Sequence, residues 1–236
     1  MVKDSVVQMG KCLIPGKLML EYIAHLIRMS NLTLGYPLKK LAIIQPFGKD
    51  NTKDPIRKGF YKLFDNKHPG IDFLANTGTQ VFASFPGIVV RKESHRGMGN
   101  IIATRYGNII ILYAHLLKFK VSLGQVIKKG QVMGLSGNSG EAITEPHLHF
   151  EIRDITKPTL KEMVINPPFG KKIRIKEKFN YKVNNTNSTK TLESLSVRYF
   201  GIKKHWRKIS KINPKQAADQ NKTVAQGVDI LIPNYQ

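Results

Sequence analysis

The chain has 236 residues, 41% of them hydrophobic and 23% charged, a composition typical of a folded globular protein and not of a disordered one. Its 38 Lys and Arg against 16 Asp and Glu give a net charge of +22, which favours a polyanionic partner such as nucleic acid, anionic lipid or an acidic envelope polymer. The single cysteine, Cys12, excludes an internal disulfide, and no apolar run reaches the ~18 residues that indicate a membrane-spanning helix.

Residues 1–40 are predicted to form an N-terminal helix followed by a linker. Leu18, Tyr22, Leu26 and Met29 recur at helical spacing, and such an apolar stripe usually packs against the rest of a protein. Charged residues interrupt this stretch, and no small-residue cleavage site follows it. We therefore expect no secretory signal peptide.

Residues 41–168 have the pattern of a mainly β domain. Short apolar runs alternate with Gly, Asn and Pro turns, which favours a compact antiparallel sheet or sandwich over alternating strands and helices. The predicted strands are Gln80–Ser84, Gly87–Arg91, Asn100–Arg105, Ile109–Ala114, Gln131–Ser136 and His147–Arg153.

The composition changes after Pro168. Residues 169–180 are predicted as a basic linker and residues 181–236 as a small second domain. The segment from position 169 onward contains 15 Lys or Arg and 4 Asp or Glu, and so holds half of the net charge. Its predicted elements are a strand at Tyr181–Val183, helices at Thr191–Tyr199 and His205–Ile212, and a strand at Val228–Pro233.

Four histidines and one aspartate of the β domain occur in three short motifs. His68 and Asp72 are four positions apart in "KHPGIDF", where a tight loop can turn both side chains towards one metal ion. His147 and His149 in "PHLHFEI" share one face of a strand, and a metal would bind one of these neighbouring imidazoles in its neutral form. His115 in "IILYAHL" stands at a strand end, a position that by itself is more typical of a core residue.

Two histidines and an aspartate would give zinc three protein ligands and leave a fourth position for water, as in catalytic zinc sites. The other two histidines could exchange protons with the substrate, and one could stabilise an oxyanion. The helical H-E-x-x-H signature is absent from the sequence, so a zinc site here would be built from strands.

The run from "HPGIDF" through "GMGNIIATRYGNIIILYAHL" to "EPHLHFEIR" resembles the lysostaphin and LytM type of zinc metallo-endopeptidase over about a hundred residues. The resemblance implies a duplicated hybrid motif fold, with the site in a groove of a compact antiparallel β-structure. It implies one Zn2+ per domain and the peptides of peptidoglycan as substrate. It also implies that His68, Asp72 and His149 bind the zinc and that His115 and His147 form the catalytic pair.

Two features depart from the pattern of that family. Glu145 stands before Pro146 where the family commonly has glycine, which adds a negative charge to the groove wall. The stretch Phe47–Lys67 is longer and more basic than a turn requires, so we expect a different substrate rim. Neither feature replaces one of the five site positions, and a chain that keeps all five is expected to be active.

The C-terminal unit resembles a LysM module through "YKV", "TLESLSVRYFG", "HWRKISKIN" and "VAQGVDILIP". This resemblance implies a βααβ fold and binding to the N-acetylglucosamine part of cell-wall glycans. The alternative interpretation is that Tyr199, Trp206 and the neighbouring leucines form the core of a small docking domain.

The sequence therefore predicts a zinc metallo-endopeptidase that acts at the bacterial cell wall on stem-peptide or cross-bridge amides, with a C-terminal module for wall binding or docking. The alternative is a structural phage tail or baseplate component whose LysM-like unit docks to partner tail proteins, with peptidase activity used for wall penetration or lost. The missing signal peptide suits delivery on a virion. Charge alone supports nucleic-acid binding, and no specific nucleic acid is expected.

Overall fold

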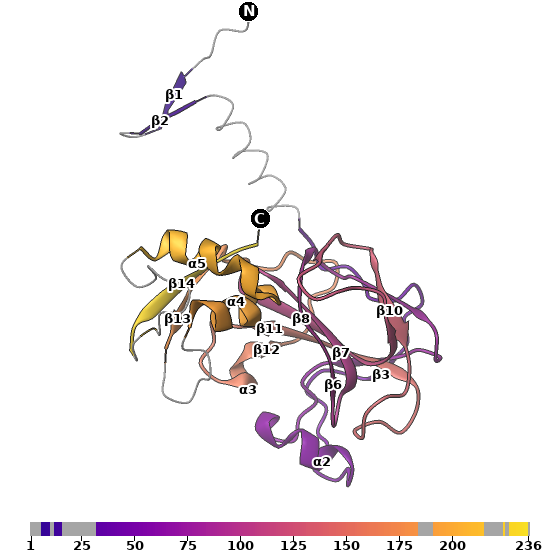
Figure 1. Ribbon diagram of the computed structural model, residues 1–236. Coiled ribbons are helices and arrows are strands. Elements are labelled where there is room, and N and C mark those ends of the chain that lie inside the picture. The colour runs from indigo at the N-terminus through magenta and orange to yellow at the C-terminus, as the bar shows by residue number, and fades with distance from the viewer. Residues whose placement is uncertain are drawn as a thin grey trace, which may run out of the picture.

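The computed structural model describes residues 6–9, 12–15, 32–183, 191–214, 224 and 227–235 (Figure 1). Strands β1 (Val6–Met9) and β2 (Cys12–Pro15) pair with each other as a small antiparallel sheet. The helix predicted around residues 18–29 lies outside the described residues. Within the described ranges, no helix is long and apolar enough to span a membrane.

A ten-stranded antiparallel sheet is the main feature of the described part of the chain. Its main path has the order β3-β4-β11-β8-β7-β6-β9, while β10 pairs with β8 and β5, and β12 pairs with β11. The strands are β3 (Ile43–Gln45), β4 (Ile71–Leu74), β5 (Gln80–Phe82), β6 (Gly87–His95), β7 (Gly99–Tyr106), β8 (Ile109–Phe119), β9 (Val126–Ile127), β10 (Val132–Ser136), β11 (His147–Asp154) and β12 (Val164–Ile165). The mainly β, antiparallel prediction is confirmed.

All six predicted strands are present, as β5, β6, β7, β8, β10 and β11. The four strands of the ten-stranded sheet that the sequence did not predict, β3, β4, β9 and β12, have only two to four residues each. Runs of this length are too short to show an apolar-polar alternation, and they are strands because a neighbouring strand pairs with them.

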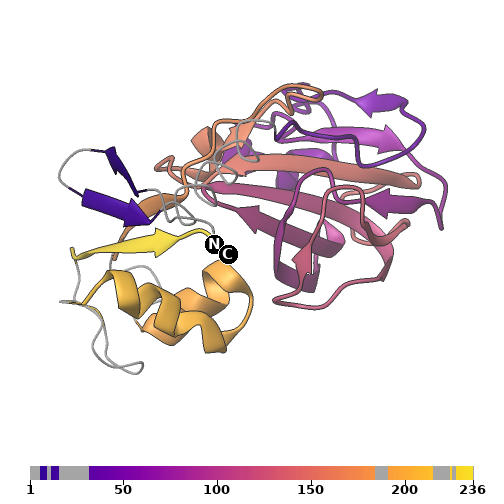
Figure 2. The same ribbon diagram turned by 90° about the horizontal axis from the view of Figure 1, so that it is seen from above.

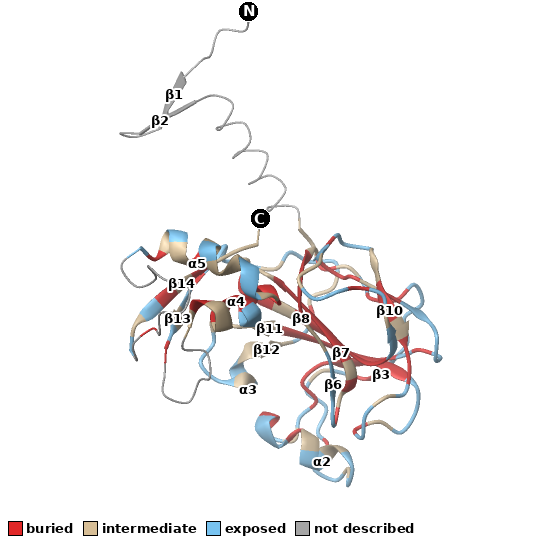
Figure 3. Cartoon of the chain, viewed as in Figure 1, coloured by how far each residue is buried: buried red, intermediate tan, exposed pale blue. Residues whose placement is uncertain are grey.

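One face of the sheet covers the main hydrophobic core. Tyr113 of β8 and Phe150 of β11 are fully buried there, and Figure 3 shows buried residues along these central strands. Leu34 and Leu38, from the predicted N-terminal linker, are buried in the same core, and Phe169 from the predicted basic linker packs against it. Both segments therefore pack on the β domain and do not merely connect it to its neighbours.

The C-terminal segment has the expected strand-helix-helix-strand order. Its elements are β13 (Lys178–Lys182), α4 (Leu192–Phe200), the short 3-10 helix η2 (Lys203–His205), α5 (Trp206–Ile212) and β14 (Asp229–Pro233). Thr191 begins α4 with a capping box to Ser194, and Gly201 ends it in the left-handed conformation. Strands β13 and β14 pair in an antiparallel ladder.

This C-terminal unit packs against the other face of the ten-stranded sheet. Its helices and strands lie beside the sheet in both ribbon views (Figures 1 and 2). Val90 and Ala103 of the sheet belong to one hydrophobic cluster with Leu195, Phe200 and Ile230 of the C-terminal unit. The two parts therefore share a core.

Candidate metal centre

Strands β4 and β11 bring two of the three sequence motifs together. Asp72 on β4 is the register partner of His149 on β11, so their side chains leave the sheet at the same level. The prediction of a tight loop at Asp72 is wrong, because the pairing of β4 with β11 makes Asp72 a strand residue. His68 precedes β4 and turns its ring inward, next to the buried ring of Tyr61, whose centroid is 5.5 Å away.

Three ligand-type atoms converge in this region. His68 Nε2 lies 3.0 Å from His149 Nδ1 and 3.1 Å from Asp72 Oδ1. His149 Nδ1 lies 2.7 Å from the same carboxylate oxygen, and all three residues are buried. Asp72 Oδ2 is also buried and has no hydrogen-bond partner. A bound cation would satisfy this oxygen in place of the missing donor. Two imidazole nitrogens and a carboxylate oxygen form a donor set that zinc prefers, so these residues could hold it.

The outward nitrogen of each of these two histidines is tied to an oxygen acceptor. His68 Nδ1 lies 3.1 Å from the carbonyl oxygen of Pro46. His149 Nε2 lies 2.9 Å from Oε1 of Glu151, which is also buried. Because an acceptor requires a proton on these nitrogens, the inward nitrogens are the ones available to a metal ion, which at His149 would take the place of the proton shared with Asp72.

His115 and His147 follow the same arrangement. They lie at the edge of the group formed by His68, Asp72 and His149, called the ligand group below. His115 Nδ1 is 2.8 Å from the carbonyl oxygen of Ser139, and His147 Nδ1 is 2.8 Å from that of Glu145. The Nε2 atoms of both rings are therefore free to accept a proton. The ring centroids of His115 and His147 are 4.7 Å apart, and that of His115 is 6.0 Å from the His149 ring. The structure thus brings all five predicted site residues into one cluster.

A break in the β7–β8 pairing positions His115. The sequence analysis placed this residue at a strand end, but it lies inside β8, where φ is 60°. The register of β8 against β7 shifts between Asn100 and Ile102, and the His115 amide instead bonds to the carbonyl of Met98. Such a bulge changes the direction of a side chain that regular alternation would fix.

Burial and charge set the protonation of the cluster. Burial lowers the pKa of His115 to about 3, helped by the neighbouring His149 and His147, so its ring is neutral at physiological pH. Burial also acts against the charged form of His149, but the hydrogen bonds to Asp72 and Glu151 outweigh it and raise its pKa to about 9. The two carboxylates that favour a proton on His149 would equally favour a metal cation beside it.

A cavity of about 260 Å³ opens onto the cluster, with His115 and His149 in its lining. The stretch Phe47–Lys67, expected to form a different rim, supplies part of the wall through the short helices α2 (Arg57–Phe60) and η1 (Lys62–Phe64). The lining also includes Leu160, the first residue of helix α3 (Leu160–Met163). The Glu145 side chain is exposed beside this region.

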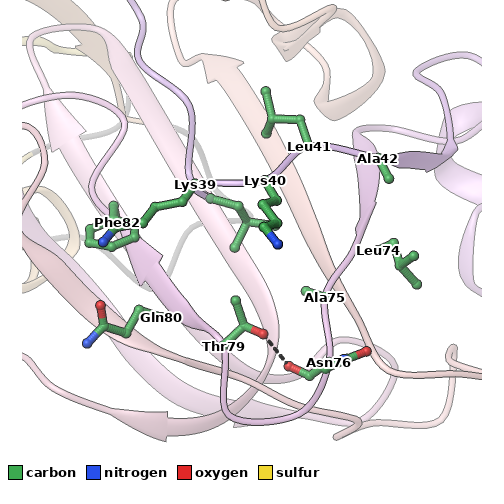
Figure 4. Close-up of a pocket in the computed structure, with 11 residues that line it drawn as sticks. Lys39, Lys40, Leu41, Ala42, Leu74, Ala75, Asn76, Thr79, Gln80 and Phe82 are labelled. Atoms are coloured by element: carbon green, nitrogen blue, oxygen red, sulfur yellow. Dashed lines mark hydrogen bonds between the residues drawn. The ribbon is translucent and has the colours of Figure 1, made fainter.

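A second cavity of about 510 Å³ lies between residues 38–42 and strands β4 and β5 (Figure 4). Lys39 extends over the ring of Phe82, with its Nζ atom 5.7 Å from the centroid, and Thr79 donates to the Asn76 carbonyl at its base. None of the five site residues lines it. We therefore place the chemistry in the histidine cavity.

The sequence analysis missed the buried carboxylate of Glu151. It accepts from His149 and is also paired with Arg153, whose Nε donates to it at 2.7 Å. The sequence did contain a signal, because positions 149, 151 and 153 alternate on one face of a predicted strand. A charged residue on a buried face next to a metal ligand is the pattern of a residue that orients that ligand.

Residues 66–167 match the family model described as Peptidase family M23. The chain is 39% identical over 111 residues to the peptidoglycan DD-endopeptidase ShyA of Vibrio cholerae, covering 47% of this chain and 25% of ShyA. It is 42% identical over 87 residues to the DD-carboxypeptidase/endopeptidase Mpg of Neisseria meningitidis, covering 36% of this chain and 20% of Mpg. The chain thus spans a quarter or less of the length of these two relatives.

The similarity and the geometry fall on the same segment. Residues 66–167 form a metallopeptidase domain of family M23. Among solved structures, the catalytic domain of the prophage-encoded M23 protein EnpA from Enterococcus faecalis is 27% identical, with a TM-score of 0.46, over 58% of this chain and 97% of that domain. Lysostaphin from Staphylococcus simulans is 35% identical, with a TM-score of 0.39, over 42% of each chain. The five clustered residues all lie inside the M23 segment.

Proposed function

We propose that the chain is a zinc-dependent endopeptidase that hydrolyses peptide bonds in bacterial peptidoglycan. One observation carries the proposal: the inward nitrogens of His68 and His149 converge with an oxygen of Asp72, beside two further neutral histidines. Peptidoglycan is proposed as the substrate because the relative ShyA is a peptidoglycan DD-endopeptidase by name, and the relative Mpg is named a DD-carboxypeptidase/endopeptidase.

The residues have separate roles in this proposal. His68, Asp72 and His149 would hold the ion, which when bound supplies a Lewis acid and makes water nucleophilic near neutral pH. The Nε2 atoms of His115 and His147, kept unprotonated by the acceptors behind each ring, would take a proton during attack and return it to the leaving amine. The His115 and His147 rings are buried, so the packing around them keeps both at fixed distances from the ligand group.

The test uses the purified full chain, its zinc content, and mass spectrometry of fragments released from purified cell walls. His149→Ala should lose both zinc and fragment release, by at least about 10³-fold, and a chelator should do the same to the unmodified protein. His205→Ala, in the C-terminal unit, is the matched control and should keep both. Wall hydrolysis by zinc-free His149→Ala protein would overturn the assignment.

The role of the C-terminal unit is a separate part of the proposal. The βααβ order and the shared motifs support a LysM-like module that holds the enzyme on wall glycan. The alternative, a phage tail component whose module docks to tail proteins, keeps the same catalytic centre. Sedimentation of the full chain with insoluble peptidoglycan, under chelator so that no hydrolysis occurs, distinguishes a wall-binding module from a docking one.

A further inference from the structure

We propose that the cavity between the M23 sheet and the C-terminal unit is a substrate subsite that binds a carboxylate-bearing segment of the wall peptide. The proposal rests on the proposed function and names the chemistry of the substrate beyond the scissile bond. It concerns residues from both parts of the chain, and the C-terminal unit supplies most of the charge that would select the ligand.

The cavity has a volume of about 680 Å³ and has an apolar floor and a polar wall. The floor is the outer face of strands β6, β7 and β8, through Val90, Ala103, Ile110 and Leu112. The wall comes from β13 and α4 of the C-terminal unit, through Asn180, Tyr181, Lys182, Arg198 and Tyr199. An extended peptide could therefore lie on the sheet with its side chains towards the C-terminal unit.

The cavity adjoins the histidine cavity. Arg91, Arg153 and Leu160 line both, so no further layer of residues separates them. His149 and Arg153 lie on the same face of β11, four positions apart, which is about 13 Å at the rise of a β-strand. A peptide bond held at the metal centre would thus place residues about four positions away inside the interdomain cavity.

The charge of the cavity is of one sign. No Asp or Glu is among its described lining residues. Glu93 pairs with Arg91 and Glu151 pairs with Arg153, so those two guanidinium groups already have carboxylate partners. The remaining lining cations are Lys157, Lys182 and Arg198, all exposed to solvent. Two of these three cations, Lys182 and Arg198, belong to the C-terminal unit, so most of the unbalanced charge lies on its side and favours an anionic ligand.

Arg198 is held in a position to bind a carboxylate. Its guanidinium carbon lies 5.5 Å from the ring centroid of Tyr181 and 5.6 Å from that of Tyr199. Stacking on two rings restricts the planar group, so less conformational entropy is lost when it pairs with a planar carboxylate through two hydrogen bonds. The apolar floor strengthens such a pair by lowering the local dielectric. A neutral sugar would gain from neither effect.

The test measures kcat and KM of the full chain on soluble muramidase-released peptidoglycan fragments, before and after their carboxylates are converted to carboxamides. Arg198→Gln should raise KM for the carboxylate form by about tenfold, with kcat little changed, and should leave KM for the amidated form unaltered. Lys182→Gln, another exposed position, should act in the same direction. Lys211→Gln removes a charge from the exposed end of α5, outside the cavity, and should change neither value.

Binding of the same fragments to chelator-treated, metal-free protein separates this proposal from the proposed function. The subsite stands and the endopeptidase assignment fails if two results are found together. The untreated protein does not hydrolyse the fragments, and Arg198→Gln still weakens binding of the carboxylate form to the metal-free protein about tenfold. If hydrolysis is normal and Arg198→Gln and Lys182→Gln leave KM and binding unchanged, the subsite is wrong and the endopeptidase stands. Equal affinity of the wild type for carboxylate and amidated fragments would also overturn the subsite.

Discussion

His115 combines a strained backbone with a position inside the cluster of four histidines and Asp72. Its φ of 60° lies in the left-handed region, which costs a side chain such as histidine roughly 1–2 kcal/mol. The conformation coincides with the bulge in β8 that turns the ring towards His147, 4.7 Å away between centroids. Regular strand geometry would not give this direction at this position. The strain is therefore part of how the site is built.

We expect His115→Asn to abolish wall hydrolysis while keeping the free energy of unfolding within about 1 kcal/mol of the wild type, since Asn tolerates the left-handed region. His115→Val should also abolish hydrolysis and should be less stable than His115→Asn by roughly 1–2 kcal/mol, because β-branched side chains fit that region poorly. Urea unfolding and fragment release measure the two effects. Equal stability of the two variants would contradict backbone strain here.

Glu151 orients His149 from behind. It accepts from His149 Nε2 at 2.9 Å, is buried, and has its pKa lowered to about 2, with Arg153 and His149 outweighing the effect of burial. Glu151→Gln keeps the shape but removes the negative charge that fixes the tautomer of the ring. We expect zinc affinity to fall by about 10- to 100-fold, measured by competition with a chromogenic chelator.

Glu93→Gln is the matched control for that variant. Glu93 pairs with Arg91 across two positions of β6, as Glu151 pairs with Arg153 across two positions of β11, but the Glu93 pair is exposed. It contacts no histidine of the cluster, so zinc affinity should not change. A loss of the same size in both variants would show that the effect is one of general strand stability and not of ligand orientation.

At the scale of elements, the long strands could be predicted because their pattern is local. The continuous apolar run from Ile109 to Ala114 predicts a buried strand from the sequence alone. The alternating polar and apolar residues of "HLHFEI" in β11 predict which side chains share a face. The two histidines of β11 were placed correctly for this reason. In the C-terminal unit, the periodic apolar residues of α4 also predicted the helix from a local signal.

The remaining features depend on pairing between distant segments. Asp72 is a strand residue only because β11, about eighty positions later, pairs with β4. The bulge at His115 arises from two neighbouring strands that differ in register, which no local pattern encodes. The bond between His149 and Glu151 could have been inferred from alternation, but the pairing with Arg153 that keeps Glu151 ionised depends on burial.

Gly70 allows β4 and β11 to approach each other at the ligand group. A Cβ atom at Gly70 would lie 2.4 Å from the Phe150 carbonyl oxygen and 3.0 Å from Cε1 of His149. We expect Gly70→Ala to lower the free energy of unfolding by about 1–3 kcal/mol, through overpacking against backbone that cannot move freely, and to weaken zinc binding as His149 shifts. Thermal unfolding and chelator competition measure the two effects.

Gly59→Ala provides the comparison within the same chain. Gly59 lies in helix α2, and a Cβ atom there would meet nothing within 4 Å. Alanine favours the helix by up to about 1 kcal/mol, so this variant should be as stable as the wild type or more stable. If Gly70→Ala were equally harmless, the close approach of β4 and β11 would not be needed to hold the ligand group.

At the scale of the whole molecule, the C-terminal unit and the M23 sheet share buried groups as well as apolar surface. Arg105 of β7 is fully buried between them. Its Nε donates to the Tyr199 carbonyl at 2.5 Å, its Nη1 to that of Gly107 at 2.8 Å, and a further nitrogen to that of Pro233 at 3.1 Å. Because Tyr199 lies in the last turn of α4, the guanidinium also caps the negative end of that helix.

Arg105→Met tests how firmly the two parts are joined. The apolar side chain fits the space but leaves the carbonyls of Tyr199, Gly107 and Pro233 without the guanidinium donors, so the free energy of unfolding should fall by about 2–4 kcal/mol. Burial lowers the pKa of Arg105 only to about 10, so the guanidinium remains charged at neutral pH and the loss should not depend on pH between about 6 and 8. In the Arg105→Met variant, the rate of amide hydrogen exchange should increase more for α4 and β14 than for β8.

Arg96→Met is the control for that variant, because Arg96 is exposed and pairs with Glu141 at the surface. Its removal should change the free energy of unfolding by less than about 1 kcal/mol. If Arg105→Met were as mild, the interface would depend on its apolar cluster alone, and the C-terminal unit could move away from the sheet without exposing a charge. A large loss confined to Arg105→Met would instead mean that the unit is held in one position, as a fixed wall beside the histidine cavity.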